Sequence, residues 1–149
     1  MGVPYNSFIG AFLSKITDYD LAVIDEQDEI VSDFMKRALA SSTFRKVCGY
    51  DFVTTANDDT GEFDVDIDED ILDEIINIVS EGMVIQWLKP YVYKQELLEN
   101  VMNTRDYTMY SPAELLLRVG NAYSKAQKDY IQMIREYSYN HGDLTDLHI

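Results

Sequence analysis

The residues from Ile71 to Leu88 would be apolar on nearly every side of an α-helix. Polar side chains form only a narrow stripe in the first half, and Gln86 is the only polar side chain among the last six residues. A helix of this kind has to be surrounded by other elements, because so much apolar surface is not stable in water. Acids precede it and Lys89 follows it, which suits the charges of a helix dipole. We therefore predict a central helix over residues 69–89, ended by Pro90.

The rest of the chain is long enough and apolar enough to cover such a helix. It has 149 residues, of which 46% are hydrophobic and 12% aromatic, so one domain can bury a core. A single cysteine, Cys48, cannot close an internal disulfide. Neither a signal peptide nor a run long enough to span a membrane is visible. We expect one soluble helical domain over residues 1–142, including an insertion at 47–67, a C-terminal tail at 143–149, and no membrane contact.

Four further segments carry helical signals. Residues 7–16, with Ser7 as a possible cap, place their apolar side chains on one face, and residues 25–41 begin with acids and end near cations. Pro90 starts or kinks a helix over about 90–102, and residues 112–140 lie between a Ser-Pro-Ala-Glu capping box and an Asn-His-Gly stop. The first segment either packs on the core or docks on a neighbouring subunit. The fold class expected is mainly α, a bundle of about five helices around the central one.

One face of the last predicted helix is a heptad seam. Its members are spaced alternately three and four residues apart: Leu116, Val119, Tyr123, Ala126, Tyr130, Met133 and Tyr137. Two interpretations stay open. The seam packs on the central helix of the same chain, with Gly120 and Ser124 permitting close approach. Alternatively, Tyr123, Tyr130 and Tyr137 form a subunit interface, where tyrosine is favoured because its ring buries area and its hydroxyl bonds a polar partner.

Residues 47–67 have a different character. Phe63, Val65 and Ile67 alternate with aspartates after a turn-like sequence, which predicts a β-hairpin or extended arm with an acidic outer face. Eleven acids and no bases lie between Asp51 and Glu74. Such a run is an alternative candidate for calcium binding, but the glycine and the final glutamate of an EF-hand are missing at the required spacing. A solvated acidic face is the simpler interpretation.

The formal charge of −15 is unevenly distributed. Residues 1–81 carry 19 acids and 5 bases, a net charge of −14, whereas residues 82–149 carry a net charge of −1. Affinity for nucleic acid comes from Lys and Arg side chains that displace counterions, so this acidic surface opposes direct DNA or RNA binding. A protein that DNA slides past without adhering would benefit from it.

Sequence patterns of common catalytic and cofactor sites are missing. There is no Gly-Lys-Ser/Thr triplet of a phosphate loop, and His141 and His148 have no metal-ligand spacing with Cys48. No nucleophile lies beside a candidate base. We expect a protein that is not an enzyme, with no catalytic residues, no cofactor and no metal.

Three stretches carry a resemblance to a known family: EGMVIQWLKPYV at 81–92, LLENVMNTRDYTMYSPAELL at 97–116 and YSYNHGDL at 137–144. They combine an apolar helix ending in Trp-Leu-Lys-Pro, a loop with Asp-Tyr-Thr and Ser-Pro, and a long helix ending near His-Gly. In this order the chain resembles the small helical connector proteins of tailed bacteriophages, particularly of phages that infect Gram-positive bacteria. The resemblance covers about half of the chain, from about Glu69 to Leu144.

The resemblance implies a head–tail adaptor, also called a head-completion or neck protein, made in the host cytoplasm and placed in the virion between portal and tail. Such proteins form a homo-oligomeric ring, commonly of twelve copies, that contacts the portal protein and the next neck or tail ring protein. DNA passes through the ring without specific binding. A terminal tail often grips the portal, and here it would comprise Asn140, His141, Gly142, Asp143, Leu144, Leu147 and Ile149.

A second interpretation is an acidic inhibitor that mimics DNA. The run from Asp51 to Glu74 would then occupy a basic cleft of a DNA-binding protein. Such a protein would be a free monomer or dimer, and its affinity for the partner would fall steeply with salt.

Overall fold

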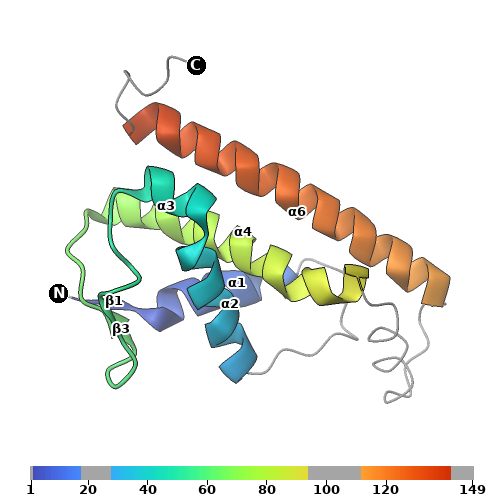
Figure 1. Ribbon diagram of the computed structural model, residues 1–149, viewed down its shortest axis with the longest axis horizontal. Coiled ribbons are helices and arrows are strands. Elements are labelled where there is room, and N and C mark those ends of the chain that lie inside the picture. Colours follow the sequence, from blue (N-terminus) through green and yellow to red (C-terminus); the bar gives the residue numbers. More distant parts are fainter. Residues whose placement is uncertain (1, 18–27, 94–111, 142–149) are drawn as a thin grey trace.

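The computed structural model describes residues 2–17, 28–93 and 112–141 of the chain. Most of these residues are helical, in α1 (Tyr5–Thr17), α2 (Asp28–Ala40), α3 (Ser42–Cys48), α4 (Glu69–Tyr93) and α6 (Pro112–His141). Three short strands, β1 (Val3–Pro4), β2 (Ala56–Asn57) and β3 (Glu62–Phe63), form an antiparallel sheet in the order β1-β3-β2. The predicted class, a mainly α-helical bundle with a small acidic hairpin, is confirmed (Figure 1).

Helix α4 is the centre of this bundle. It packs against α1 and α2, and α6 runs along it in the opposite direction (Figure 1). Ile75, Met83 and Leu88 are fully buried, whereas the acids of its first turn, Glu69 and Asp70, are exposed. The apolar sequence is therefore covered by the flanking helices, as predicted, and the acidic start faces water.

The prediction that Pro90 ends the central helix is wrong. Helix α4 continues to Tyr93, with the proline in its last turn. Proline has no N–H to donate to the carbonyl of Gln86, four residues earlier, so one helical hydrogen bond is lost. Because only one turn is affected, the helix tolerates the loss. Residues 90–93 of the segment predicted at 90–102 thus belong to α4, and residues 94–102 lie outside the described residues.

Helix α1 begins at Tyr5, not at the predicted cap Ser7, because the small sheet holds its first residue. The Tyr5 backbone N–H donates to the Gly61 carbonyl at 2.8 Å, and its hydroxyl donates to Asp58 Oδ1 at 2.8 Å. Phe8 and Phe12 on this helix are fully buried. The helix therefore packs on the core of its own chain, which was the first of the two interpretations.

Helix α3 and strand β1 were not predicted. Helix α3 follows α2 after one residue and buries Phe44 and Cys48, and its C-cap, Gly49, adopts a left-handed conformation with φ 77°. Strand β1 pairs with β3 and sets Val3 opposite Phe63. Both elements are too short to show a hydrophobic period in the sequence.

The hairpin predicted within 47–67 consists of β2, β3 and the turn between them. Phe63 is fully buried, with ring centroids 5.5 Å from Phe8 and 5.4 Å from Phe52. After Phe63 the predicted alternation continues without strand pairing among the described residues. Val65 and Ile67 are half-buried, whereas the aspartates between and after them are exposed.

Candidate interaction site

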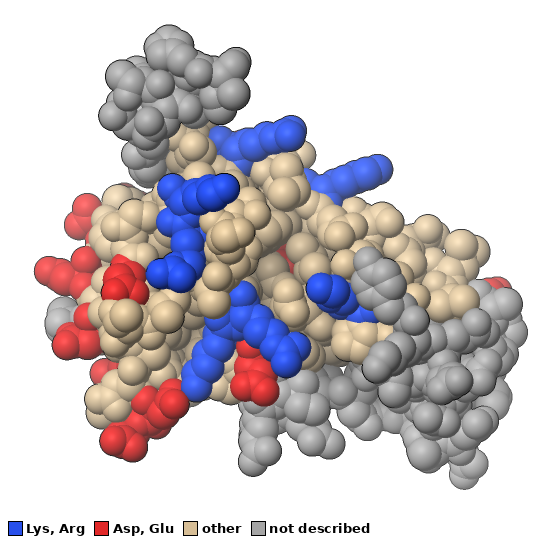
Figure 2. All heavy atoms as spheres, viewed as in Figure 1, with Lys and Arg blue, Asp and Glu red and all other residues tan. Residues whose placement is uncertain are grey.

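The acids of residues 51–74 gather at one end of the molecule. All eleven are exposed, and they lie in the hairpin, in the extended segment after it and in the first turns of α4. We call them the acidic end. In Figure 2 most of the visible Asp and Glu side chains lie there, whereas Lys and Arg lie over the middle of the face and along α6. The uneven charge of the sequence is therefore a separation of charge in space.

Asp58 and Asp51 of this end have local partners. Asp58 accepts hydrogen bonds from Lys36 Nζ at 3.1 Å and from the Tyr5 hydroxyl, and these contacts, that with Lys36 first, lower the pKa of its carboxyl. Asp51 accepts from the side chain and backbone of Thr54, which lowers its pKa as well. Asp58 thus ties the turn of the hairpin to α1 and α2, and Asp51 orders the segment that leads into the hairpin.

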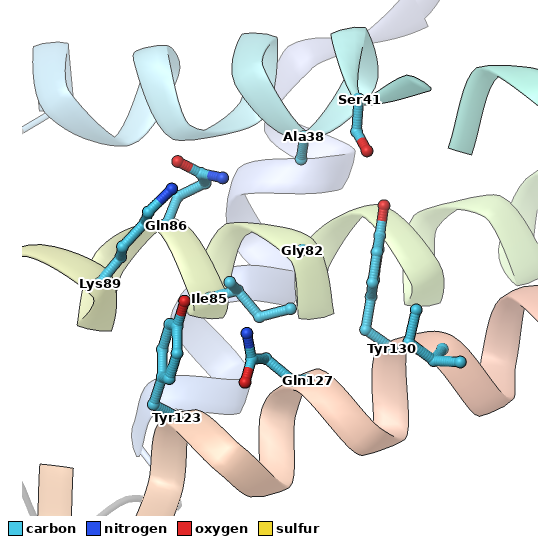
Figure 3. A pocket seen from close by; sticks show the side chains of 10 residues that line it. Ala38, Ser41, Gly82, Ile85, Gln86, Lys89, Tyr123, Gln127 and Tyr130 are labelled. Carbon is cyan, nitrogen blue, oxygen red and sulfur yellow. The ribbon is translucent and has the colours of Figure 1, made fainter. Parts of the chain in front are cut away.

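A groove of about 300 Å³ opens where α2, α4 and α6 meet (Figure 3). Gly82 of α4 lies at its centre, between Ala38 of α2 and Tyr130 of α6. A Cβ at this position would lie 3.1 Å from Tyr130 Cε1 and 3.2 Å from Ala38 Cβ. The close approach of helices predicted at Gly120 occurs at Gly82 instead, since a Cβ on Gly120 would meet nothing within 4 Å. The sequence signal for this close approach is the position of Gly82 inside the apolar stretch from Ile71 to Leu88.

The groove combines an apolar floor with a polar rim. Ala38, Ile85 and Ile131 contribute apolar surface, and the polar lining side chains are Ser41, Gln86, Lys89, Tyr123, Gln127 and Tyr130. Ser41 hydrogen-bonds to the Tyr130 hydroxyl, but burial dominates and raises the pKa of that phenol. Of the described residues that line the groove, Lys89 is the one with a charge. Such a lining can accept an apolar side chain together with hydrogen-bonding or anionic groups.

The two sides of α6 differ in charge. On the side that lines the groove, Ile131 has Lys128 three residues before it and Arg135 four residues after it, a spacing that places them on one helix face. On the other side, Met133 has Asp129 four residues before it and Glu136 three residues after it, and Lys125 pairs with Asp129 at 2.7 Å. Lys128 and Arg135 are exposed. The groove therefore opens onto a face whose nearest charges on α6 are positive.

The three tyrosines predicted at a subunit interface lie against other elements of their own chain. Tyr123, Tyr130 and Tyr137 are 9%, 8% and 5% exposed, and α6 packs along α4 through this seam. The Tyr137 hydroxyl donates to the Cys48 carbonyl at 3.0 Å and so ties α6 to α3. Tyr123 and Tyr130 also line the groove, where their remaining surface is accessible. Packing within the chain is confirmed, and a contact with a second subunit stays a prediction.

The predicted portal-binding tail begins at the end of α6. Asn140 is exposed, and His141 is the last helical residue. The other members, Gly142, Asp143, Leu144, Leu147 and Ile149, lie outside the described residues.

Two further polar groups of the core bear on chemistry and stability. Cys48 is buried, its Sγ donates to the Tyr50 carbonyl at 3.5 Å, and burial raises the pKa of the thiol, which disfavours the nucleophilic thiolate. Glu81, which the sequence placed on a polar stripe, is only 5% exposed and lies 3.0 Å from Lys15 Nζ. Lys15 also donates to Asn77 Oδ1 at 2.8 Å. This cluster links α1 to α4.

Two other kinds of site are missing from the described ranges. Within residues 2–17, 28–93 and 112–141, no group of three or more His, Cys, Asp or Glu is arranged to hold a metal ion. None of the helices in those ranges has both the length and the apolar character needed to cross a membrane. Compared with models of known protein families, with curated proteins and with solved structures, the chain matches none of them.

Proposed function

We propose that this protein is a structural component of a bacteriophage particle, a head–tail adaptor that forms a ring on the portal and extends the DNA channel towards the tail. The observation that carries the proposal is the order of elements over the resembling stretches. The Trp-Leu-Lys-Pro sequence at 87–90 lies near the end of central helix α4, and α6 runs from Pro112 to His141. This is the order of the helical connector proteins that the sequence resembles.

The surface of the molecule supports a role in assembly. Helix α6 buries one face against α4 and exposes Leu117, Ile131 and Tyr139, large side chains that can pack on another protein. The formal charge of −15 disfavours adhesion of DNA phosphates, as a channel component requires. The copy number of twelve and the contact with the next ring protein are further parts of the proposal.

Labelled native particles provide the direct test. Negative-stain images of phage particles, decorated with an antibody against this protein, should show the label at the neck, between capsid and tail. Label on the capsid surface, on the tail tip or on no part of the particle would contradict the adaptor function.

Portal binding tests the role of the C-terminal residues. A variant that lacks residues 142–149, which follow α6, should bind the portal protein of the same phage at least about tenfold more weakly than the full chain. A chain with those residues replaced by a Gly/Ser sequence of equal length is the matched control for length, and it should bind as weakly as the deletion. Full portal binding by the deletion variant would remove the tail from the proposal.

A DNA-mimicking inhibitor is the second candidate, favoured by the exposure of all eleven carboxylates of the acidic end. Such a protein would bind a basic cleft directly, and its affinity would fall steeply as salt screens the charges. Copurification of one DNA-binding protein with this chain, reversed by salt and by DNA, would support this function. Native particles should then carry no label, in contrast to the adaptor function.

A further inference from the structure

We propose that the groove between α2, α4 and α6 is the docking site for the acidic end of a second copy of this chain. This contact rests on the proposed ring and specifies which surfaces would join its subunits. The groove, with Lys89 in its lining and Lys128 and Arg135 on the adjoining side of α6, is called the groove face below. Copies would then associate in one direction, the acidic end of each on the groove face of the next.

Charge complementarity favours this occupant. The described charges of the groove face are positive, and its floor is apolar, so a segment with carboxylates beside a few apolar atoms fits both. Among the described residues the acidic end is a segment of this kind, because Asp64, Asp66 and Asp68 are exposed and alternate with half-buried apolar residues. A neutral or basic segment would leave the cations of the groove face without opposite charge.

The acidic end of a copy lies away from its own groove. Glu69, at the start of α4, is thirteen positions before Gly82 in the same helix, or about 20 Å from it along the axis. Figures 1 and 2 show the hairpin at one end of the molecule, whereas the Lys and Arg side chains lie over the middle and along α6. The opposite charges can therefore meet between copies.

The two surfaces are different parts of the molecule, and a contact in which each copy offers one of them to the next copy is heterologous. Repetition of a heterologous contact gives a closed ring where the rotation fits, or an open filament where it does not. A two-fold dimer through the acidic ends would instead set like charges against each other. The formal charge of −15 makes whole molecules repel at long range, but at about 0.15 M salt screening acts over about 8 Å, and the charges at the contact dominate.

Charge exchange between the two surfaces tests the contact. The face variant Lys128→Glu/Arg135→Glu and the end variant Asp64→Lys/Asp66→Lys each change four units of charge at exposed positions. Each variant alone should associate at least about tenfold more weakly than the wild type, by sedimentation velocity in about 0.15 M salt. An equimolar mixture should recover association between unlike copies, because the unchanged acidic end of the face variant can dock on the unchanged groove face of the end variant.

The matched control is Arg118→Glu/Lys125→Glu, which makes the same charge change on α6 outside the groove side. It should associate as the wild type does, and circular dichroism should show the same helix content in all variants. The contact would be overturned by a wild type that stays monomeric up to about 0.5 mM, by a mixture without recovery, or by a control as weak as the face variant.

Neck labelling is independent of these substitutions. Label at the neck without recovery in the mixture refutes the contact alone, and recovery without neck label refutes the adaptor function alone.

Discussion

A mostly buried ion pair, Lys15 with Glu81, links α1 to α4. The two side chains are 23% and 7% exposed. A charge removed from water is costly unless it is paired, so loss of the lysine leaves the Glu81 carboxylate with an uncompensated cost. We expect Lys15→Met, which retains the aliphatic stem, to lower the free energy of unfolding by about 1–3 kcal/mol in urea denaturation.

The exposed pair Lys125 with Asp129 provides the control for this change. Its atoms are 2.7 Å apart, but the lysine is 70% exposed, so water solvates both charges when the pair is broken. Lys125→Met should cost no more than about 0.5 kcal/mol. Equal losses in the two variants would show that burial does not determine the strength of the Lys15 contact.

Tyr137 makes the free energy of unfolding depend on pH in the alkaline range. Burial, supported by nearby negative groups, raises the pKa of its phenol to about 12, against about 10 in an unfolded chain. The fold therefore favours the neutral phenol. Its contribution is complete below pH of about 10 and is lost as the pH rises towards 12. Urea denaturation between these values should show falling stability, less steeply in Tyr137→Phe.

The same substitution removes the hydrogen bond to the Cys48 carbonyl, so Tyr137→Phe should also lose about 1 kcal/mol at neutral pH. Tyr139→Phe is the matched control, because Tyr139 is 72% exposed on the same helix. It should leave both the neutral stability and the alkaline slope unchanged. An alkaline slope that is identical in wild type and Tyr137→Phe would contradict the assignment.

At the scale of helices, Gly82 sets the distance between α2, α4 and α6. Alanine favours a helix over glycine by about 1 kcal/mol, but the new Cβ would lie 3.2 Å from the Cβ of Ala38, which moves only with the backbone of α2. We expect the overpacking to exceed the gain and Gly82→Ala to destabilise by about 1–2 kcal/mol in thermal or urea unfolding. Gly120→Ala, with open space around the Cβ, should instead stabilise by about 0.5–1 kcal/mol. A stabilised Gly82→Ala would show that the helices can separate freely.

The elements that could be predicted were those with local signals. The apolar side chains of α2 and α6 recur at helical spacing over several turns, and α4 is apolar on nearly every side, so the positions of these helices follow from the sequence itself. Strand β1 depends on pairing with β3, some sixty residues away, and no local pattern announces that partner. The end of α4 was missed for a different reason: proline weakens a helix through one hydrogen bond, and packing of the preceding turns can outweigh that loss.

The groove is a property of the whole molecule and could not be derived from one segment. It requires Ala38, Gly82 and Tyr130, which are far apart in the sequence, to meet at one crossing of three helices. The heptad seam did predict that Tyr130 would be buried, and the charge counts predicted an acidic surface. Neither pattern specifies that Lys128 and Arg135 lie beside the groove while the acidic end, around the hairpin and the start of α4, lies away from it. That arrangement exists only after the helices have packed.

The crowded charge of the acidic end should lower the stability of the whole fold. Eleven exposed acids repel one another there, and unfolding relieves the repulsion because the open chain holds them further apart. Salt screens exposed charges over about 10 Å at 0.1 M and about 3 Å at 1 M. At protein concentrations low enough to keep monomers, raising NaCl from about 0.02 M to about 0.5 M should increase the free energy of unfolding by about 0.5–1 kcal/mol in thermal denaturation.

Removal of acids separates this repulsion from other effects of salt. Asp64→Asn/Asp66→Asn should raise stability at low salt and reduce the further gain from added salt, since both carboxylates are exposed among like charges. Asp58→Asn is the matched control: it removes the same kind of charge but also weakens the contacts with Lys36 and Tyr5, so it should not stabilise. If the Asp64/Asp66 variant is no more stable than the wild type at low salt, the acids are far enough apart for water to screen them, and the charge of this end would affect association alone.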